Sequence, residues 1–174
     1  MTTIRNAEPA VTRPTRPPVD KRRFMARMTG VIVGGMFIDG YILGIIGTAI
    51  GAASDELGMS LLWEGLIGAS ALIGIFIGGP LGGWLADKFG RKPLFTIDLA
   101  LFLVGSVLQF FVDSAWQLFV VRLLMGVAIG ADYSVGWPLL AEFAPARRRG
   151  RLMSLNEVAW YLGFMVAFCV GYTM

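Results

Sequence analysis

Residues 83–92 read GWLADKFGRK and lie between two long apolar runs, at 62–85 and 94–112. An acid, Asp87, stands at the end of the first run, and Gly90 supplies a turn before two bases. Three further apolar runs occupy 28–51, 116–141 and 152–174. Each run exceeds or approaches the ~20 residues that an α-helix needs to cross a bilayer. Because the runs are continuously apolar rather than alternating, they predict helices and exclude a β-barrel.

The composition of the 174-residue chain is that of a membrane protein. Hydrophobic residues make up 56% of the chain and charged residues only 16%, whereas soluble domains average about 25% charged residues. Histidine is absent, which excludes His-dependent zinc sites and Ser–His triads. The one cysteine, Cys169, lies in an apolar run and predicts neither a disulfide nor a metal cluster. We therefore expect an all-α membrane protein with about five transmembrane helices, no enzymatic activity and no cofactor.

Basic residues predict the topology. Fourteen of the 15 Lys and Arg residues fall in residues 1–27, in the turn at 88–92 and in the turn at 147–151. The two other connections carry none, so basic and non-basic segments alternate as five crossings require. The positive-inside rule then predicts a cytoplasmic N-terminus. We expect a multi-pass protein of the cell's inner (plasma) membrane. Residues 1–27, which are basic and rich in proline, predict a disordered cytoplasmic tail, and the net charge of +3 reflects topology rather than a nucleic-acid partner.

Three charged side chains lie well inside apolar runs: Asp39, Arg122 and Asp132. Arg122, the fifteenth basic residue, falls in 116–141, and Asp39 falls about midway along 28–51. A buried Arg costs about 2.5–3.5 kcal/mol on insertion scales, so we expect it to face a cavity or a partner. Asp39 is a possible partner, roughly 9 Å away along the membrane normal at 1.5 Å per residue. A carboxyl group that is both buried and close to an Arg can exchange a proton, so the sequence predicts proton coupling through Asp39 and Arg122. A static ion pair with a purely structural role is the alternative.

Several glycines are spaced by four residues, including Gly74/Gly78 and Gly126/Gly130. This spacing lets helix backbones approach closely in lipid and predicts tight packing between the helices that carry them.

Residues 83–92 resemble the G-x-L-A-D-[RK]-x-G-R-[RK] loop of the major facilitator superfamily and match it at every defining position. Residues 122–130, RLLMGVAIG, resemble the R-x-x-x-G-x-x-x-G helix of the same family. The resemblance implies a cytoplasmic latch between helices, with Asp87 and Arg91 as its charged members. It covers residues 28–174 and corresponds to the first five helices of a family that usually has twelve.

A narrower resemblance involves Asp132, Tyr133, Glu142 and Arg149. Their spacing is similar to that in phosphate–proton and metabolite–proton symporters related to the sugar porters. The resemblance implies that Asp132 takes part in proton transfer and that Tyr133 contacts the substrate. It also implies that Glu142 and Arg149 join the cytoplasmic gating cluster of Asp87 and Arg91. For Glu142 an ordinary charge at a helix end remains the alternative.

The sequence departs from the phosphate symporters at Trp160, where those proteins place a Gln about eleven residues after the Arg of the R-G pair. An indole donates one hydrogen bond and accepts none, but its face can stack on a sugar or an aromatic ring. This difference favours an organic metabolite over phosphate, with Trp160 in substrate binding. Packing of Trp160 against lipid is the alternative. Glu157 and Asp98 are equally compatible with a vestibule and with helix-end charges.

We therefore expect a proton-coupled symporter of a small organic metabolite, such as a sugar or an organic or aromatic acid, that works by alternating access. The expected partners are this substrate, protons, the lipid bilayer and a missing C-terminal half, because sites in this superfamily form between two halves. On this interpretation the chain is an incomplete N-terminal half, with residues 28–174 as transmembrane helices 1–5. The alternatives are a non-transporting interaction or sensor subunit and a proton-coupled transporter of inorganic phosphate.

Overall fold

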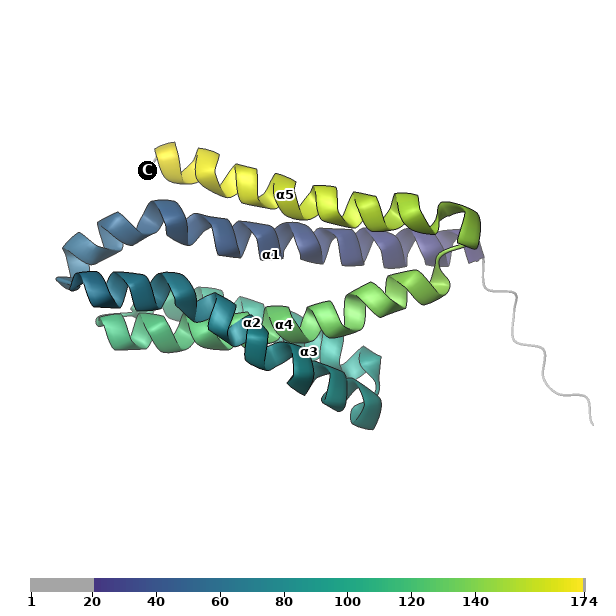
Figure 1. Ribbon diagram of the computed structural model, residues 1–174, viewed down its shortest axis with the longest axis horizontal. Helices are drawn as coiled ribbons and strands as arrows, with labels where there is room; N and C mark the ends of the chain where they lie inside the picture. The colour runs from purple at the N-terminus through teal and green to yellow at the C-terminus, as the bar shows by residue number, and fades with distance from the viewer. Residues whose placement is uncertain (1–20, 174) are drawn as a thin grey trace, which may run out of the picture.

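The computed structural model describes residues 21–173, which form a bundle of long helices lying roughly side by side (Figure 1). This range contains five α-helices and two short 3₁₀ turns, one between the third and fourth α-helices and the other between the fourth and fifth. The α-helices are α1 (Lys21–Leu57), α2 (Leu61–Phe89), α3 (Arg91–Leu108), α4 (Ala115–Phe143) and α5 (Arg149–Thr173), and the 3₁₀ turns are η1 (Gln109–Phe111) and η2 (Ala146–Arg148).

Helix α1 begins earlier than the sequence suggested. Its first residue is Lys21, so residues 21–27 are helical and do not belong to a disordered tail. These residues contain no proline or glycine, and Lys, Arg, Met and Ala favour helix, so the helix extends past the apolar run. The remainder of the expected tail, residues 1–20, lies outside the described part of the chain.

Four segments among the described residues are long and apolar enough to cross a membrane: Met25–Leu57, Leu61–Phe89, Ala115–Phe143 and Ala146–Thr173. Helix α3 and η1 contribute a shorter apolar stretch, Thr96–Phe111. These findings confirm the predicted all-α, multi-pass membrane fold, in which the third of the five expected crossings is shorter than the other four. Helix α4 is the most buried of the four long segments.

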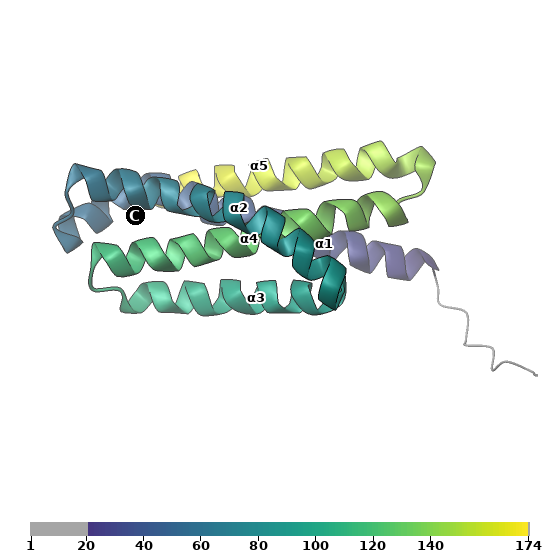
Figure 2. The ribbon, with the colours of Figure 1, turned by 60° about the horizontal axis from the view of Figure 1, so that its bottom comes forward.

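The helices associate in two closely packed pairs. Helix α1 lies along α5, and α2 lies along α4, while α3 packs on the other side of α4 (Figures 1 and 2). Gly74 and Gly78 place α2 directly against the backbone of α4, and Gly126 and Gly130 do the same for α4 against α2. A Cβ atom at any of the four would collide with backbone atoms of the partner helix. The glycine spacing therefore marks the α2–α4 interface, as predicted.

A tight turn at Gly90 reverses the chain between α2 and α3. Gly90 has a φ of +87°, a conformation that side chains with a Cβ rarely adopt. This turn and the connection from α4 to α5 lie at the same end of the bundle as the start of α1 (Figures 1 and 2). The basic segments of the sequence thus gather at one end, which we call the basic end. Its assignment to the cytoplasm remains a prediction from the positive-inside rule.

Candidate functional site

Two carboxyl groups are buried inside the bundle. Asp39, midway along α1, is completely inaccessible, and Asp132 on α4 is 5% exposed. Within residues 21–173, neither carboxyl oxygen of Asp39 has a hydrogen-bond partner, and Oδ1 of Asp132 has none either. The other oxygen of Asp132 points toward α1, because a Cβ atom on Gly35 would lie 3.8 Å from it. An unpaired carboxylate is costly to bury, so both groups favour binding of a proton or a cation.

Arg122 is also buried, at 2% exposure, but it does not pair with these acids. Its Nη2 atom donates a long hydrogen bond of 3.4 Å to the carbonyl oxygen of Ile42 on α1. Its Nε atom has no partner. Among the described residues, no ion pair joins Arg122 to Asp39 or Asp132. The guanidinium therefore lies beside the backbone one turn beyond Asp39, and its charge is left unmatched in this conformation.

Tyr133 and Trp160, the two predicted substrate-binding residues, lie on different helices and contact each other. The indole Nε1 of Trp160 on α5 donates a 2.8 Å hydrogen bond to the Tyr133 hydroxyl on α4. The indole also stacks on Phe164, with ring centroids 5.5 Å apart and planes 12° from parallel. Trp160 is therefore held by neighbours inside the protein, rather than packed only against lipid.

Both residues line a cavity of about 370 Å³ between α1, α4 and α5. The described residues around it are Met36, Tyr133, Trp137, Glu157, Trp160 and Tyr161. Tyr133 also lies within electrostatic range of Asp39 and Asp132, which connects this cavity to the buried acids.

The sequence analysis did not single out Met36 and Trp137 for this cavity. Trp137 follows Tyr133 by four residues, so the two share a face of α4, and this spacing was the available signal. The contribution of Met36 had no such signal, because it depends on how α1 leans against α4 and α5.

At the basic end, Arg91 and Glu142 form a two-pronged ion pair. The Nη1 and Nη2 atoms of Arg91, at the start of α3, donate hydrogen bonds of 2.8 and 2.9 Å to the two carboxylate oxygens of Glu142 on α4. The hydrogen bonds to Glu142 raise the pKa of Arg91 above its usual value. Planar Arg–carboxylate forks of this kind fix geometry as well as adding attraction. The interaction joins the turn after α2 to the end of α4.

The other two members of the predicted cluster are placed differently. Asp87 acts on Arg91 electrostatically, without a hydrogen bond. Arg149, the first residue of α5, is exposed and makes no hydrogen bond or ion pair with Arg91, Glu142 or Asp87 in the described part of the chain. The structure therefore brings Arg91, Glu142 and Asp87 together and leaves Arg149 apart.

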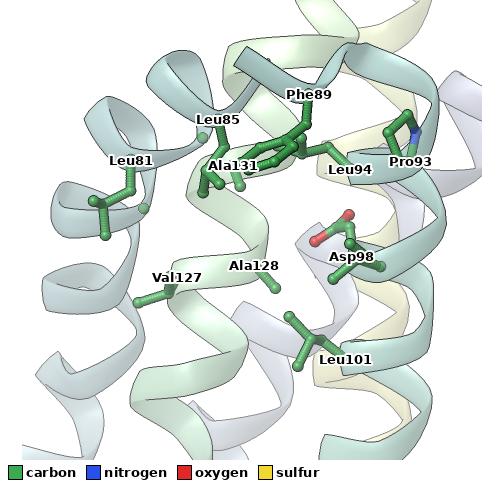
Figure 3. Close-up of a pocket in the computed structure, with 13 residues that line it drawn as sticks. Leu81, Leu85, Phe89, Pro93, Leu94, Asp98, Leu101, Val127, Ala128 and Ala131 are labelled. Atoms are coloured by element: carbon green, nitrogen blue, oxygen red, sulfur yellow. The ribbon is translucent and has the colours of Figure 1, made fainter. Parts of the chain in front are cut away.

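A further acid, Asp98 on α3, is buried at 6% exposure with no partner for its Oδ1 atom. It borders a pocket of about 480 Å³ between α2, α3 and α4, whose other described walls are almost entirely apolar (Figure 3). The sequence had left Asp98 open between a vestibule residue and a helix-end charge. Its burial shows that it is not an ordinary end charge. Asn156 on α5 is likewise fully buried, with both polar atoms of its amide unpartnered.

Comparison with known proteins identifies relatives of this chain. The chain is 40% identical over 150 residues to the inner membrane metabolite transport protein YgcS of Escherichia coli (strain K12). It is 41% identical over 139 residues to the putative metabolite transport protein YaaU of the same organism. The alignments cover 86% and 80% of this chain but only 34% and 31% of those proteins. The chain thus spans about a third of the length of these relatives.

Solved structures share the fold. The major facilitator superfamily proton:xylose symporter XylE, bound to 6-bromo-6-deoxy-D-glucose, superimposes with a TM-score of 0.77 at 26% identity, covering 88% of this chain and 38% of XylE. An inward-open structure of XylE from E. coli gives a TM-score of 0.75 at 27% identity, covering 86% of this chain and 40% of that one. The model of the "Sugar (and other) transporter" family matches residues 27–174. With its two helix pairs, its buried acids and these matches, the chain belongs to the sugar (and other) transporter family of the major facilitator superfamily.

Proposed function

We propose that the protein works in an inner membrane as a secondary active transporter that moves a small organic metabolite together with protons. The observation that carries this proposal is the position of the Tyr133–Trp160 cavity near two buried carboxyl groups, Asp39 and Asp132, which have oxygen atoms without a hydrogen-bond partner among the described residues. A substrate site and a proton site within electrostatic range of each other can be coupled, because filling one changes the free energy of filling the other.

The lining of the cavity favours an organic substrate over phosphate. Four of the six described residues around it are aromatic, and the other two are Met36 and Glu157. None of the six is Lys or Arg. Phosphate is usually held by Arg, Lys or backbone N–H groups, whereas aromatic faces and a few hydrogen-bonding groups suit a sugar or a ring-containing metabolite. Two relatives of the chain carry substrates of this class in their names: one is a D-xylose transporter of Levilactobacillus brevis. Another is a putative niacin/nicotinamide transporter of Bacillus subtilis (strain 168).

The mechanism we propose assigns the chemistry to three buried charged side chains and to two aromatic residues beside them. A proton that reaches Asp39 or Asp132 removes a costly charge from the interior. The substrate then binds against Tyr133 and Trp160, and the neutral, loaded bundle changes its access from one side to the other. Arg122 provides the positive charge that a deprotonated Asp39 approaches when the helices rearrange. Asp87, Arg91 and Glu142 form the gating cluster at the basic end, where the Arg91–Glu142 pair holds α3 to α4 in one state.

The direct test is accumulation of substrate in proteoliposomes. We expect an inwardly directed proton gradient to concentrate a radiolabelled sugar or ring-containing metabolite inside vesicles that contain the protein, and an uncoupler to abolish the gain. Xylose, nicotinate and inorganic phosphate form the first panel. The chain is assayed by itself and together with the C-terminal half of a relative such as YgcS.

The outcomes separate the candidate functions. Accumulation of xylose or nicotinate supports the proposal, and accumulation of phosphate alone would replace it with a phosphate transporter. If properly folded protein transports nothing with the added half present, and instead binds another membrane protein, the interaction or sensor function is correct.

A further inference from the structure

Of the buried acids in the described part of the chain, Asp98 is the one that the proposed cycle leaves without a task. It lies in the second turn of α3, and its carboxyl group extends across the gap toward α4, near Ala128 and Ala131 (Figure 3). The residues that α2 contributes around it, Leu81, Leu85 and Phe89, are apolar. No described side chain donates a hydrogen bond to its Oδ1 atom. Among the described residues, the buried Oδ1 atom of Asp98 therefore has no partner that offsets its loss of water.

A small void lies between Asp98 and Asp132. It measures about 10 Å³ and is lined by Leu94, Asp98, Ala131, Asp132 and Val135. This is about the smallest space that holds one water molecule, and a buried water needs two or more polar partners. Two carboxyl groups supply those partners here, and the other three side chains are apolar. Each of the two acids has an Oδ1 atom that is buried and unpartnered.

Asp98 and Asp132 line the same void, and no cation is among its described lining residues. The titratable groups that act on Asp98 and Asp39 from the neighbouring helices are carboxyl groups: Asp132 acts on both, and Asp98 also acts on Asp39. The buried cation among the described residues, Arg122, hydrogen-bonds to the Ile42 carbonyl instead. Two carboxylates that face each other without a cation repel, so the pair is most stable with a single proton between them.

We propose that Asp98 and Asp132 share one proton through a single internal water, so that Asp98 is a positioning residue that controls when Asp132 gains and loses its proton. In each transfer, the protonated carboxyl gives its proton to the water while the water gives one of its own to the other carboxylate. The number of protons is unchanged, and one carboxyl and one carboxylate remain. This inference rests on the proposed proton-coupling role of Asp132, but the pair itself can be observed without transport.

The test is infrared spectroscopy of the reconstituted protein during a pH titration. Asp98→Asn and Asp132→Asn keep the size of the side chain and remove the acid, and Asp55→Asn changes an exposed acid as the matched control. Carbonyl bands of protonated carboxyl groups are assigned from their loss in each variant. We expect Asp98→Asn to change the frequency of the Asp132 band and to move its pH midpoint by about one pH unit or more, as coupled acids do. The control leaves that band unchanged.

The infrared bands test the coupling of Asp98 and Asp132, and the accumulation assay tests the proposed transport function. If the Asp132 band keeps both its frequency and its midpoint in a folded Asp98→Asn protein, Asp98 and Asp132 are not coupled and the inference is wrong, whatever the protein transports. If the bands are coupled but no proton gradient drives accumulation, the pair stands and the proposed function fails. If Asp98→Asn does not fold, the Asp98 band is followed in Asp132→Asn instead. An unchanged frequency and pH midpoint of the Asp98 band would then show that the two acids are not coupled.

Discussion

The hydrogen bond between Trp160 and Tyr133 is the residue-scale contact that holds the proposed substrate site together. Trp160→Phe keeps an aromatic ring but removes the N–H group that donates to the Tyr133 hydroxyl. The loss of one such bond is worth about 1 kcal/mol, so we expect substrate affinity to fall roughly fivefold. The measurement is the KM for uptake of the substrate identified in proteoliposomes.

The matched control for this substitution is Trp84→Phe, which alters an indole on the exposed surface of α2. It should leave the KM unchanged. An unchanged KM in Trp160→Phe would remove Trp160 from the substrate site and return it to a packing role.

The Arg91–Glu142 pair is the second residue-scale contact with a functional prediction. Both side chains are partly exposed, and exposed pairs contribute little to stability. Reversal of either charge, in Arg91→Glu or Glu142→Arg, should therefore leave the Tm nearly unchanged but reduce the uptake rate several-fold. The double exchange, Arg91→Glu with Glu142→Arg, should restore part of the rate, because it re-creates an ion pair between α3 and α4.

Arg151→Glu provides the comparison, since Arg151 is an exposed base near the same end without this contact. Equal losses of uptake in Arg151→Glu and Arg91→Glu would mean that only the total charge of the basic end matters. The pair would then have no gating role.

How far the sequence could predict the site differs from residue to residue. Burial of Asp39, Arg122 and Asp132 follows directly from their positions inside apolar runs, and the structure has all three inside the bundle. The contact between Tyr133 and Trp160 required two helices to meet, which only the family resemblance suggested. The sequence left Asp98 open between a vestibule residue and a helix-end charge, because it lies few residues after the bases of the turn. Only the packing of α3 against α4 shows its burial.

At the scale of elements, the close approach of α2 and α4 makes a prediction about stability. Gly126→Ala would place a Cβ against the backbone at Ala71, and overpacking of this kind costs about 1–3 kcal/mol. We expect this variant to unfold at a clearly lower denaturant concentration in mixed micelles. Gly68→Ala, at an open position on the exposed face of α2, should be as stable as the unchanged protein. Equal stability of both variants would show that α2 and α4 do not pack this closely.

The helix boundaries show why sequence patterns locate elements better than their ends. All five apolar runs became helices, because the absence of water leaves the backbone no other hydrogen-bonded form. The start of α1 was misplaced because apolarity marks only the segment inside the membrane. The helix continues into water for as long as its residues favour helix.

At the scale of the whole molecule, the grouping of basic segments predicts which end faces the cytoplasm. In a Cys169→Ser background, Lys88→Cys and Arg148→Cys should react with a membrane-impermeant thiol reagent only from the cytoplasmic side. Asp55→Cys and Asp113→Cys should react only from the opposite side, since they lie in the connections without basic residues. All four positions are exposed. Labelling of Lys88→Cys and Asp113→Cys from the same side would contradict the five-crossing topology.

The central claim is that acids held inside the helical bundle carry the proton that drives transport. Asp39→Asn tests it most directly, because the amide keeps the shape of the side chain but cannot release a proton. Two rates are measured in the same proteoliposomes: accumulation of substrate driven by a proton gradient, and exchange of labelled for unlabelled substrate without a gradient. The account predicts that Asp39→Asn loses gradient-driven accumulation and retains exchange. Undiminished accumulation against a concentration gradient in Asp39→Asn would contradict it.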